Sequence, residues 1–375
     1  MSHLPVPFFD YARLYEIDYP VYSNALNDVL LRSDFILRDD LIDFEKNLAK
    51  YLEIEHVVGV ANGTDAIWLG LMAAGITSGD EVILPSHTYV ATADAVKFLG
   101  ATPVLVDCQE DHLVSPAAIE EAITDRTRAI IPVNLNGRAC QLDEIQNIAK
   151  KYDLKIVEDN AQGLGAKLEG RSTGSFGESG TMSFFPAKNL GCLGDGGAVT
   201  TNSKDIAEKI LLLRNHGRNS SGEVVAWGLN SRLDNLQAAI LNAKLSHLDE
   251  SIALRRKIAT LYCEGLYDVE QIVLPPKPEE SARHFDSYQN FEIEAEDRDE
   301  LREYLSSKGI GTSLPWGGKA VHHFNLPGVK VKDLSRTEKL FTKILLLPLN
   351  QYMHEAEVVQ VIEQLRNFYL RRHAE

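Results

Sequence analysis

Cysteine is scarce and scattered in this chain. Its 375 residues include four cysteines, Cys108, Cys140, Cys192 and Cys263, with no CxxC pair and no histidines grouped at metal-ligand spacing. Disulfide-built domains are small and dense in cysteine, and structural zinc sites need paired ligands a few residues apart. We therefore expect reduced thiols, no disulfide framework and no metal site.

Long apolar runs and an excess of positive charge are lacking as well. No window approaches the roughly 20 apolar residues of a membrane-spanning helix, and early acidic residues argue against a signal peptide. We expect a cytoplasmic protein with no membrane partner. The 38 Lys and Arg against 54 Asp and Glu give a formal net charge of -16. This disfavours a nucleic-acid binder, which needs a clustered basic surface.

What is present is the composition of a compact, enzyme-sized protein. Hydrophobic residues make up 44% and charged residues 25%, close to the average of soluble globular proteins. Because 375 residues exceed what one core usually supports, we expect two domains. We predict a large α/β domain over residues 1–245 and a smaller C-terminal α+β domain over residues 246–375.

Short β-branched runs alternate with helical stretches between about residues 55 and 201. This rhythm predicts a mostly parallel sheet covered by helices, and nearly continuous apolar runs such as VLVD and AIIPV are typical of strands buried on both faces. The predicted sheet has seven strands, at residues 56–60, 81–84, 103–107, 129–133, 155–158, 181–184 and 198–201.

Helical periodicity dominates residues 233–267, which predicts one long helix that links the two domains. The Pro-rich stretch LPPKP at 274–278 interrupts this pattern. A strand-like FEIE, a helix DRDELREYLSSKG and a final amphipathic helix from about His354 should follow.

Two segments place polar groups where a ligand can bind. The turn ANGTDA follows a strand and opens a helix, so the backbone N–H groups of Gly63 and Thr64 would lie at a positive helix end, as in a phosphate cradle. An ordinary capped turn has the same pattern. Glu158 and Asp159 close an apolar strand at its carboxyl end, where ligands bind in open α/β sheets. A helix-capping role for the acid is the alternative.

The segment SFFPAKNLGCLGDGGAV sets Lys188 in a loop of small residues directly after a buried strand. A partly shielded ammonium in such a place is suited to lose its proton and attack an aldehyde. A solvated loop lysine fits the same spacing. Cys192, four residues further on, is better suited to packing than to the mobile nucleophile of a Cys desulfurase.

Five segments, taken together, resemble the blocks of one known family in order and separation. They are NGTDA, PSHTYVATADAV, EDNAQGLGA, SFFPAKNLGCLGDGGAV and GLNSRLDNLQAAIL. The chain resembles, over nearly its whole length, the DegT/DnrJ/EryC1/StrS family of nucleotide-sugar aminotransferases, which are fold type I pyridoxal-phosphate enzymes. Lys188 follows Asp159 by 29 residues, as in that family.

The resemblance implies a role for each matched residue. Lys188 would hold pyridoxal 5'-phosphate as a Schiff base and act as the acid-base that moves protons between the cofactor and the sugar carbon. Asp159 would hold the pyridine nitrogen of the cofactor, and Gln162 would lie near its phenolic oxygen.

The resemblance extends to the cofactor's ring and phosphate. His87 falls where the family places a ring stacked on the cofactor, although a core histidine is the alternative. Ser183 would join Gly63 and Thr64 on the phosphate. Asn230 matches an Asn that reaches the cofactor phosphate of the neighbouring subunit, which implies a homodimer with shared active sites; a helix-capping Asn is its alternative.

The implied reaction is a ping-pong transamination. An amino acid, which we expect to be L-glutamate, leaves its amine as pyridoxamine 5'-phosphate, and a nucleotide-linked keto sugar then collects it. The segment at 230–250 is more similar to members acting on 3-keto sugars, so we expect amination at C3 of a dTDP- or UDP-linked sugar in polysaccharide or antibiotic synthesis. A 4-keto-sugar aminotransferase and a non-catalytic, cofactor-binding regulatory protein are the alternatives.

Some positions depart from the family pattern in segments that should touch substrate. Asn134 stands where many members have His, and Arg38 where many have Gly. The segment PWGGKAVHHF differs from the usual loop before the family's His, for which His322 is the candidate. Arg38, Lys319 and His322 are the predicted substrate-binding residues, with a solvated surface charge as the alternative for Arg38 and Lys319.

Overall fold

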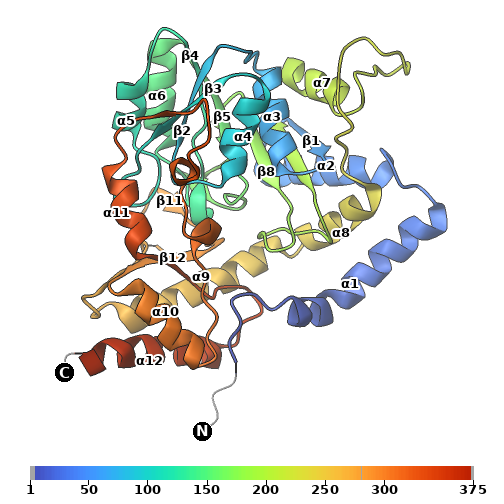
Figure 1. Ribbon diagram of the computed structural model, residues 1–375. Helices are drawn as coiled ribbons and strands as arrows, with labels where there is room; N and C mark the ends of the chain where they lie inside the picture. The colour runs from blue at the N-terminus through green and yellow to red at the C-terminus, as the bar shows by residue number, and fades with distance from the viewer. Residues whose placement is uncertain (1–4, 280, 373–375) are drawn as a thin grey trace.

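The computed structural model describes residues 5–279 and 281–372, and its largest feature is an eight-stranded sheet (Figure 1). The strand order is β1-β9-β8-β5-β4-β2-β3-β13. Only the pairs of β9 with β1 and β8 are antiparallel. The strands are β1 (His56–Val60), β2 (Glu81–Pro85), β3 (Thr102–Val106), β4 (Thr127–Ile130), β5 (Lys155–Asp159), β8 (Ser179–Ser183), β9 (Gly197–Thr201) and β13 (Lys330–Val331).

Helices account for most of the remaining regular structure. They are α1 (Tyr11–Arg32), α2 (Asp39–Leu52), α3 (Gly63–Ala73), α4 (Val90–Phe98), α5 (Pro116–Ala122), α6 (Leu142–Tyr152), α7 (Lys204–Leu213), α8 (Asn235–Leu245), α9 (Leu248–Leu266), α10 (Arg298–Ser307), α11 (Ser335–Lys343) and α12 (Glu355–Arg372). None of the helices within the described residues is long and apolar enough to cross a membrane.

The central strands are buried on both faces, as their apolar runs predict. Val82 packs in a cluster with α3 and α4, whereas its neighbour Ile83 packs in a cluster with α5 and α6. Successive side chains of a strand point to opposite faces, so both faces of β2 are covered by helices. The fold type I architecture expected from the sequence is confirmed.

The sheet differs from the prediction by one strand. All seven predicted strands are present, and β13 adds an eighth at the edge, parallel to β3. This strand has two residues and comes from the C-terminal part of the chain. A two-residue segment has no alternation to read, and only its long-range pairing makes it a strand.

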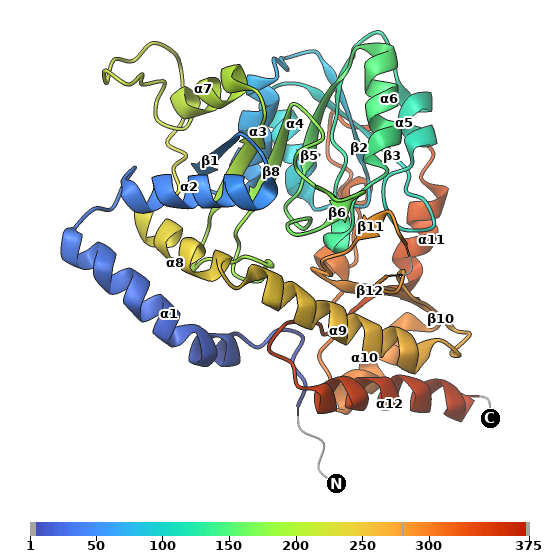
Figure 2. The same cartoon turned by 180° about the vertical axis from the view of Figure 1, so that it is seen from behind.

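The predicted long helix over 233–267 is also corrected. The structure has two helices, α8 and α9, separated by Ser246 and His247. The break leaves the apolar spacing almost unchanged, which is why periodicity did not reveal it. Two helices that precede the sheet, α1 and α2, were not predicted from the sequence. Figure 2 shows α1 lying along the outside of the molecule, beside α8.

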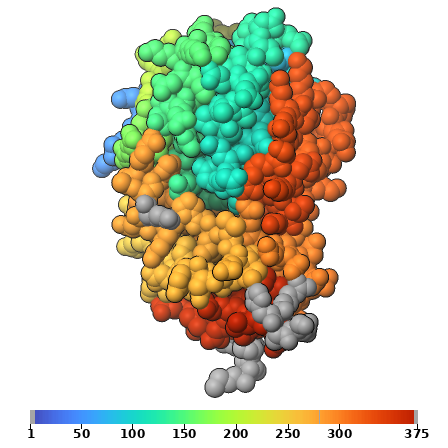
Figure 3. Space-filling view, turned by 90° about the vertical axis from the view of Figure 1, so that its left-hand side faces the viewer, coloured from blue at the N-terminus to red at the C-terminus, as the bar shows by residue number. Residues whose placement is uncertain are grey.

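A smaller antiparallel sheet lies below the large one in Figure 1. It consists of β10 (Ile272–Val273), β12 (Phe291–Ala295) and β14 (Ile344–Leu347), and its core is shared with α9, α10 and α12. The predicted strand FEIE and the two predicted C-terminal helices are confirmed here. In Figure 3 the C-terminal residues lie both beneath and alongside the large sheet's residues. The domain boundary at residue 245 stays a prediction.

A third, minor sheet joins the two regions. It consists of β6 (Lys167–Leu168), β7 (Arg171–Ser172) and β11 (His284–Phe285), with β6 in the centre. The segment from β11 to β12 therefore runs directly past the loops at the carboxyl ends of the parallel strands. Side chains of this segment contact residues around the candidate site, as Asn290 does with Gln162 and Gln289 with the carbonyl of Ala187.

Candidate active site

A cavity of about 730 Å³ opens at the carboxyl ends of the central strands. Its walls come from the start of α3, the loop between β2 and α4, the ends of β5 and β8, and the short turn at Pro315–Gly317. Six of the residues predicted from the sequence meet in it: Gly63, Thr64, Asp159, Gln162, Ser183 and Lys188. These residues are far apart in sequence, and the parallel strand order brings them together.

The start of α3 forms a cradle for an anion. Asn62 caps the helix by accepting a hydrogen bond from the backbone N–H of Asp65 at 2.8 Å. A Cβ added to Gly63 would lie 2.8 Å from Cβ of Ser183, so the close approach of these two segments requires glycine. Free N–H groups at a positive helix end, with a hydroxyl opposite, fit the phosphate of pyridoxal phosphate.

Asp159 is a buried carboxylate at the end of β5. It accepts hydrogen bonds from Oγ1 of Thr92 at 2.8 Å and from the backbone N–H of Ala161 at 3.1 Å. Burial raises the pKa of Asp159, while these hydrogen bonds and the charge of Lys188 act in the opposite direction. A shielded carboxylate in this position is suited to hold a protonated pyridine nitrogen.

Glu158, the preceding residue, points to the other face of the sheet. Its carboxylate is completely buried and accepts hydrogen bonds from the backbone N–H groups of Gly174, Phe176 and Gly177 and from the side chain of Asn134. It lines no part of the cavity. Of the two acids that close this strand, Glu158 therefore stabilises a loop, and Asp159 faces the cavity.

Lys188 lies on the cavity wall, in the loop after β8. Its backbone N–H donates to the carbonyl of Phe185 at 2.8 Å, which fixes the turn that carries the side chain. Burial lowers the pKa of Lys188 to about 8, against the opposing charge of Asp159. At pH 7 about one lysine in ten would then be neutral, the form that attacks an aldehyde. The residues present therefore fit the expected cofactor at its phosphate, ring nitrogen and aldehyde.

The structure does not place His87 in the cavity. Its ring is buried behind the cavity wall, where Nδ1 lies 3.0 Å from the carbonyl oxygen of His112 and the ring packs edge-on against Trp316 and Phe341. The core-histidine alternative describes this position better than ring stacking. Tyr89, two residues later, lines the cavity instead, and 55% of its surface is exposed.

Further lining residues were not identified from the sequence. Thr92 lies in the first turn of α4, three residues after Tyr89. The position of α4 beside the end of β5 turns its side chain toward Asp159. Trp316 belongs to the C-terminal part of the chain and has a left-handed backbone conformation (φ 49°). No local sequence pattern indicates that it lines the cavity. Asp195, in the loop after Lys188, also lines the cavity.

The remaining predicted residues lie outside this cavity. Asn230 is exposed and pairs by a β-bridge with Asn215, in the long loop after α7. Arg38 is exposed at the start of α2, and Lys319 is exposed beside the ring of Phe324. Within one chain, then, the structure brings neither predicted basic residue to the site.

His322 lies in a hydrogen-bonded cluster behind the loop that carries Tyr89. Its Nδ1 is 2.6 Å from Oγ of Ser86, and its Nε2 is 2.9 Å from Glu338. His323 also reaches Glu338 through Nε2, at 3.2 Å, while its Nδ1 accepts the backbone N–H of Ala320. A neutral His323 therefore carries its proton on Nε2, so these three groups are arranged for hydrogen bonding rather than for metal binding.

Charge in the cavity is unbalanced. Among the described lining residues, Asp65, Asp159 and Asp195 are acidic and Lys188 is the only Lys or Arg. A phosphate-bearing ligand has the helix end of α3 and Lys188 to offset its charge.

Known proteins are similar to this chain over nearly its whole length. A model of the DegT/DnrJ/EryC1/StrS aminotransferase family matches residues 21–366. The dTDP-3-amino-3,4,6-trideoxy-alpha-D-glucose transaminase of Streptomyces venezuelae is 38% identical over 374 residues, covering 97% of this chain and 96% of the relative. A Geobacillus stearothermophilus protein named pleiotropic regulatory protein is 39% identical over 370 residues, covering 97% and 98%. The UDP-2-acetamido-2-deoxy-3-oxo-D-glucuronate aminotransferase of Pseudomonas aeruginosa is 36% identical over 351 residues, covering 92% and 94%.

Solved structures agree with these sequence relatives. The crystal structure of S. venezuelae DesV superposes with a TM-score of 0.92 at 38% identity, covering 97% of this chain and 98% of that one. NtdA from Bacillus subtilis, solved with bound cofactor PMP, superposes with a TM-score of 0.87 at 32% identity, covering 98% and 85%.

Proposed function

The chain belongs to the DegT/DnrJ/EryC1/StrS aminotransferase family and is a pyridoxal-phosphate-dependent nucleotide-sugar aminotransferase, and from this premise we propose that it aminates C3 of a nucleotide-linked 3-keto sugar. The observation that carries the aminotransferase chemistry is the cavity itself, which combines a lysine of lowered pKa with a buried carboxylate and a helix end. Each of the three groups fits one part of the cofactor: the lysine fits its aldehyde, the carboxylate its ring nitrogen and the helix end its phosphate.

Pyridoxal 5'-phosphate, when bound, supplies an electron sink that allows an amino group to leave one carbon and join another. The chain's own residues would provide the rest. Lys188 would attach the cofactor and carry protons to and from the reacting carbon at Nζ. Asp159 would keep the proton on the ring nitrogen, and Ser183 with the start of α3 would bind the phosphate. Tyr89 would cover the ring.

Support for C3 comes from the relatives. The S. venezuelae and P. aeruginosa proteins are named for amination at C3 of a dTDP-linked and a UDP-linked sugar, respectively. Both cover more than nine-tenths of the chain. We propose a dTDP- or UDP-linked 3-keto sugar as the acceptor and L-glutamate as the amino donor, with amination at C4 as the alternative.

We also propose a homodimer with shared active sites. The unbalanced charge of the cavity supports this, because a nucleotide diphosphate and a cofactor phosphate together need more positive groups than Lys188 and one helix end. The loop after α7 carries Arg218, Trp227 and Asn230 on a projecting segment (Figure 1), and 96% of the surface of Trp227 is exposed. We propose that this segment reaches the cavity of the second copy.

A two-stage experiment tests the function. L-Glutamate is added to the purified holoenzyme, and the visible absorption of the cofactor should change to that of the pyridoxamine form. A nucleotide-linked 3-keto sugar should then restore the first spectrum, and NMR of the product should show nitrogen on C3. No spectral change with any common amino donor would favour a regulatory role, a possibility raised by the Geobacillus relative's name. Nitrogen on C4 would overturn the proposed amination at C3.

A further inference from the structure

We propose that Asn290, together with Asn136, is a positioning residue that fixes the amide of Gln162 with its N–H₂ end toward the cofactor. The inference rests on the proposed function, because it takes Gln162 as the neighbour of the cofactor's phenolic oxygen. Gln162 lines the active-site cavity. Asn136 and Asn290 lie behind it, on the wall of a second and much smaller cavity.

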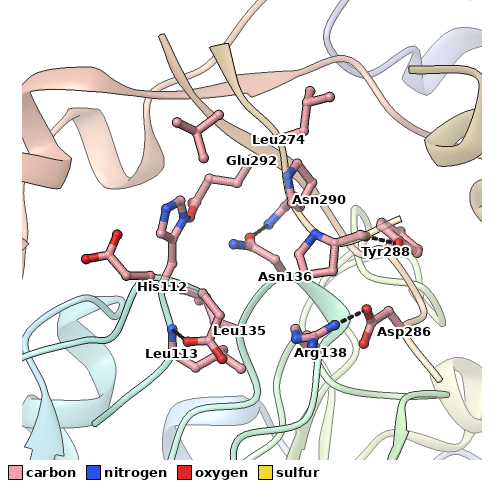
Figure 4. Close-up of a pocket in the computed structure, with 15 residues that line it drawn as sticks. His112, Leu113, Leu135, Asn136, Arg138, Leu274, Asp286, Tyr288, Asn290 and Glu292 are labelled. Carbon is pink, nitrogen blue, oxygen red and sulfur yellow. Dashed lines mark hydrogen bonds and ion pairs between the residues drawn. The ribbon is translucent and has the colours of Figure 1, made fainter. Parts of the chain in front are cut away.

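The three amides form a closed set of hydrogen bonds. The backbone N–H of Asn136 donates to Oε1 of Gln162 at 2.9 Å. Nδ2 of Asn290 donates to the same oxygen at 3.1 Å and to Oδ1 of Asn136 at 2.9 Å. Figure 4 shows the side chains of Asn136 and Asn290 pointing toward each other in the wall of the smaller cavity.

This pattern determines which end of Gln162 faces the active site. A backbone N–H can only donate, so the group it meets must be the oxygen of Gln162 and not the nitrogen. The second donor, from Asn290, reinforces that assignment. Because Oε1 is held from behind by two donors, Nε2 is the end left for the cavity, and a cavity-facing N–H₂ stabilises an anionic oxygen opposite it.

Asn136 and Asn290, which together form a clamp on Oε1 of Gln162, come from different parts of the fold. Asn136 belongs to the short 3-10 turn at Leu135–Gly137, after β4, and has a left-handed backbone (φ 57°). Asn290 directly precedes β12 of the small C-terminal sheet. The orientation of an active-site amide therefore depends on how the C-terminal sheet sits against the large one.

A merely structural role is the competing explanation, and the chain offers a matched control for it. Nη1 of Arg138 and Oδ2 of Asp286 form an ion pair at 2.5 Å between the same two segments (Figure 4). Arg138 lies two residues after Asn136, and Asp286 lies four before Asn290. This pair ties the segments together without contact to Gln162. Weakening this ion pair tests the effect of the contact between the two segments alone.

The experiment compares five variants of the holoenzyme: Asn290→Leu, Asn290→Asp, Gln162→Leu, Asp286→Asn and Asn290→Ser. The first removes the donor at similar size, and the small cavity of about 60 Å³ beside it gives room for repacking. The second places an acceptor against Oε1 of Gln162 and should turn the amide around. The fourth is the control. The two readouts are the pH titration of the cofactor's visible absorption and the Kd of pyridoxal phosphate for the apoprotein.

We expect Asn290→Leu to move the midpoint of the absorption titration upward by roughly half a pH unit or more, and Asn290→Asp to move it at least as far. The Kd for the cofactor should rise several-fold in both. Asn290→Ser, which keeps a donor, should recover part of the shift. Asp286→Asn should lower the Tm but leave the titration midpoint unchanged.

Two outcomes would overturn the inference in distinguishable ways. If Gln162→Leu shifts the midpoint but Asn290→Leu and Asn290→Asp titrate like the wild type, the clamp is only structural, and the proposed place of Gln162 stands. If Gln162→Leu itself has no effect, then Gln162 does not face the phenolic oxygen, and the role that the family resemblance implies for it fails. The glutamate experiment judges the transamination separately.

Discussion

Thr92 donates a hydrogen bond of 2.8 Å to Asp159, joining the first turn of α4 to the end of β5. Oγ1 of Thr88 lies 2.8 Å from Oγ1 of Thr92, so the hydroxyls form a short chain that ends on the carboxylate. A buried carboxylate with fixed donors keeps a defined orientation. Since the adjacent Glu158 has its own set of donors on the other face, two neighbouring acids have separable tasks.

The first prediction separates those tasks. Asp159→Asn should lower kcat/KM on the order of 100-fold, because an amide does not hold the proton on a ring nitrogen, and the Tm should change little. Glu158→Gln should lower the free energy of unfolding by about 2 kcal/mol, since buried backbone donors lose a charged acceptor. Steady-state kinetics and thermal unfolding measure the two effects. A Glu158 variant with normal stability and no activity would contradict the division.

The second prediction concerns the ring that covers the cofactor. Tyr89→Ala should raise the Kd of pyridoxal phosphate about tenfold through loss of ring contact, and Tyr89→Phe should restore it. His87→Ala should instead lower the Tm, because it empties a packed position beside Trp316 and Phe341. Titration of the two apoproteins with cofactor decides whether Tyr89 or His87 contacts the cofactor ring. A normal Kd in Tyr89→Ala with a raised Kd in His87→Ala would reinstate the sequence-based assignment.

The third prediction concerns Lys188. Lys188→Ala should lower kcat by about 1,000-fold or more, because both the attachment point and the proton carrier are lost. Non-covalent cofactor, or its adduct with the aminated sugar nucleotide, should still bind, which absorption and native mass spectrometry can detect. Lys204→Ala, on an exposed ion pair of α7, is the control and should retain full activity. Substantial turnover by Lys188→Ala would refute the assignment.

The fourth prediction is the pH dependence of cofactor attachment. Only the neutral amine attacks an aldehyde, and burial lowers the pKa of Lys188 to about 8. The rate of covalent attachment to the apoprotein should therefore rise with pH up to about 8 and then level off. In Asp159→Asn the plateau should begin at lower pH, because the carboxylate that raises the lysine's pKa is gone. Borohydride trapping followed by mass spectrometry gives the rates; a rise that continues to pH 10 would contradict the lowered pKa.

The fifth prediction rests on a buried charge cluster between the two sheets. Nδ1 of His112 lies 2.8 Å from Glu292, and its Nε2 lies 3.1 Å from Glu294. His87 is 3.7 Å from Glu292. Burial alone would lower the pKa of each histidine, but the carboxylates outweigh it and raise both values to about 9. The same contacts lower the pKa of both glutamates, against burial.

The sign of the pH effect follows from these directions. A histidine whose pKa is raised stabilises the fold fully below its ordinary value near 6.5, and this stability is lost as the pH rises toward 9. The free energy of unfolding should fall by on the order of 2 kcal/mol between pH 6.5 and 9, with a matching fall in Tm, and His112→Gln should flatten that fall. The exposed His247→Gln is the control. A fall of the same size in His112→Gln would show that the cluster is not its cause.

The sequence by itself determined the framework of the site. Runs of apolar residues place the strands, and parallel strands present their carboxyl ends along one edge. That is why the turn at Gly63, the acid at Asp159 and the loop of Lys188 meet in one cavity, as the family resemblance implied. Alternation also requires that Glu158 and Asp159 face opposite sides, although it does not say which acid faces the ligand.

The remaining features of the site depend on long-range packing. The loop of His87 and Tyr89 is irregular, so its local sequence does not determine which ring turns inward. The break between α8 and α9 spans only Ser246 and His247, which is too short for apolar periodicity to reveal. Trp316 and Asn290 reach the site only because the C-terminal sheet packs against the large one. Contacts between residues more than 100 positions apart depend on that packing, and no local pattern in the chain encodes it.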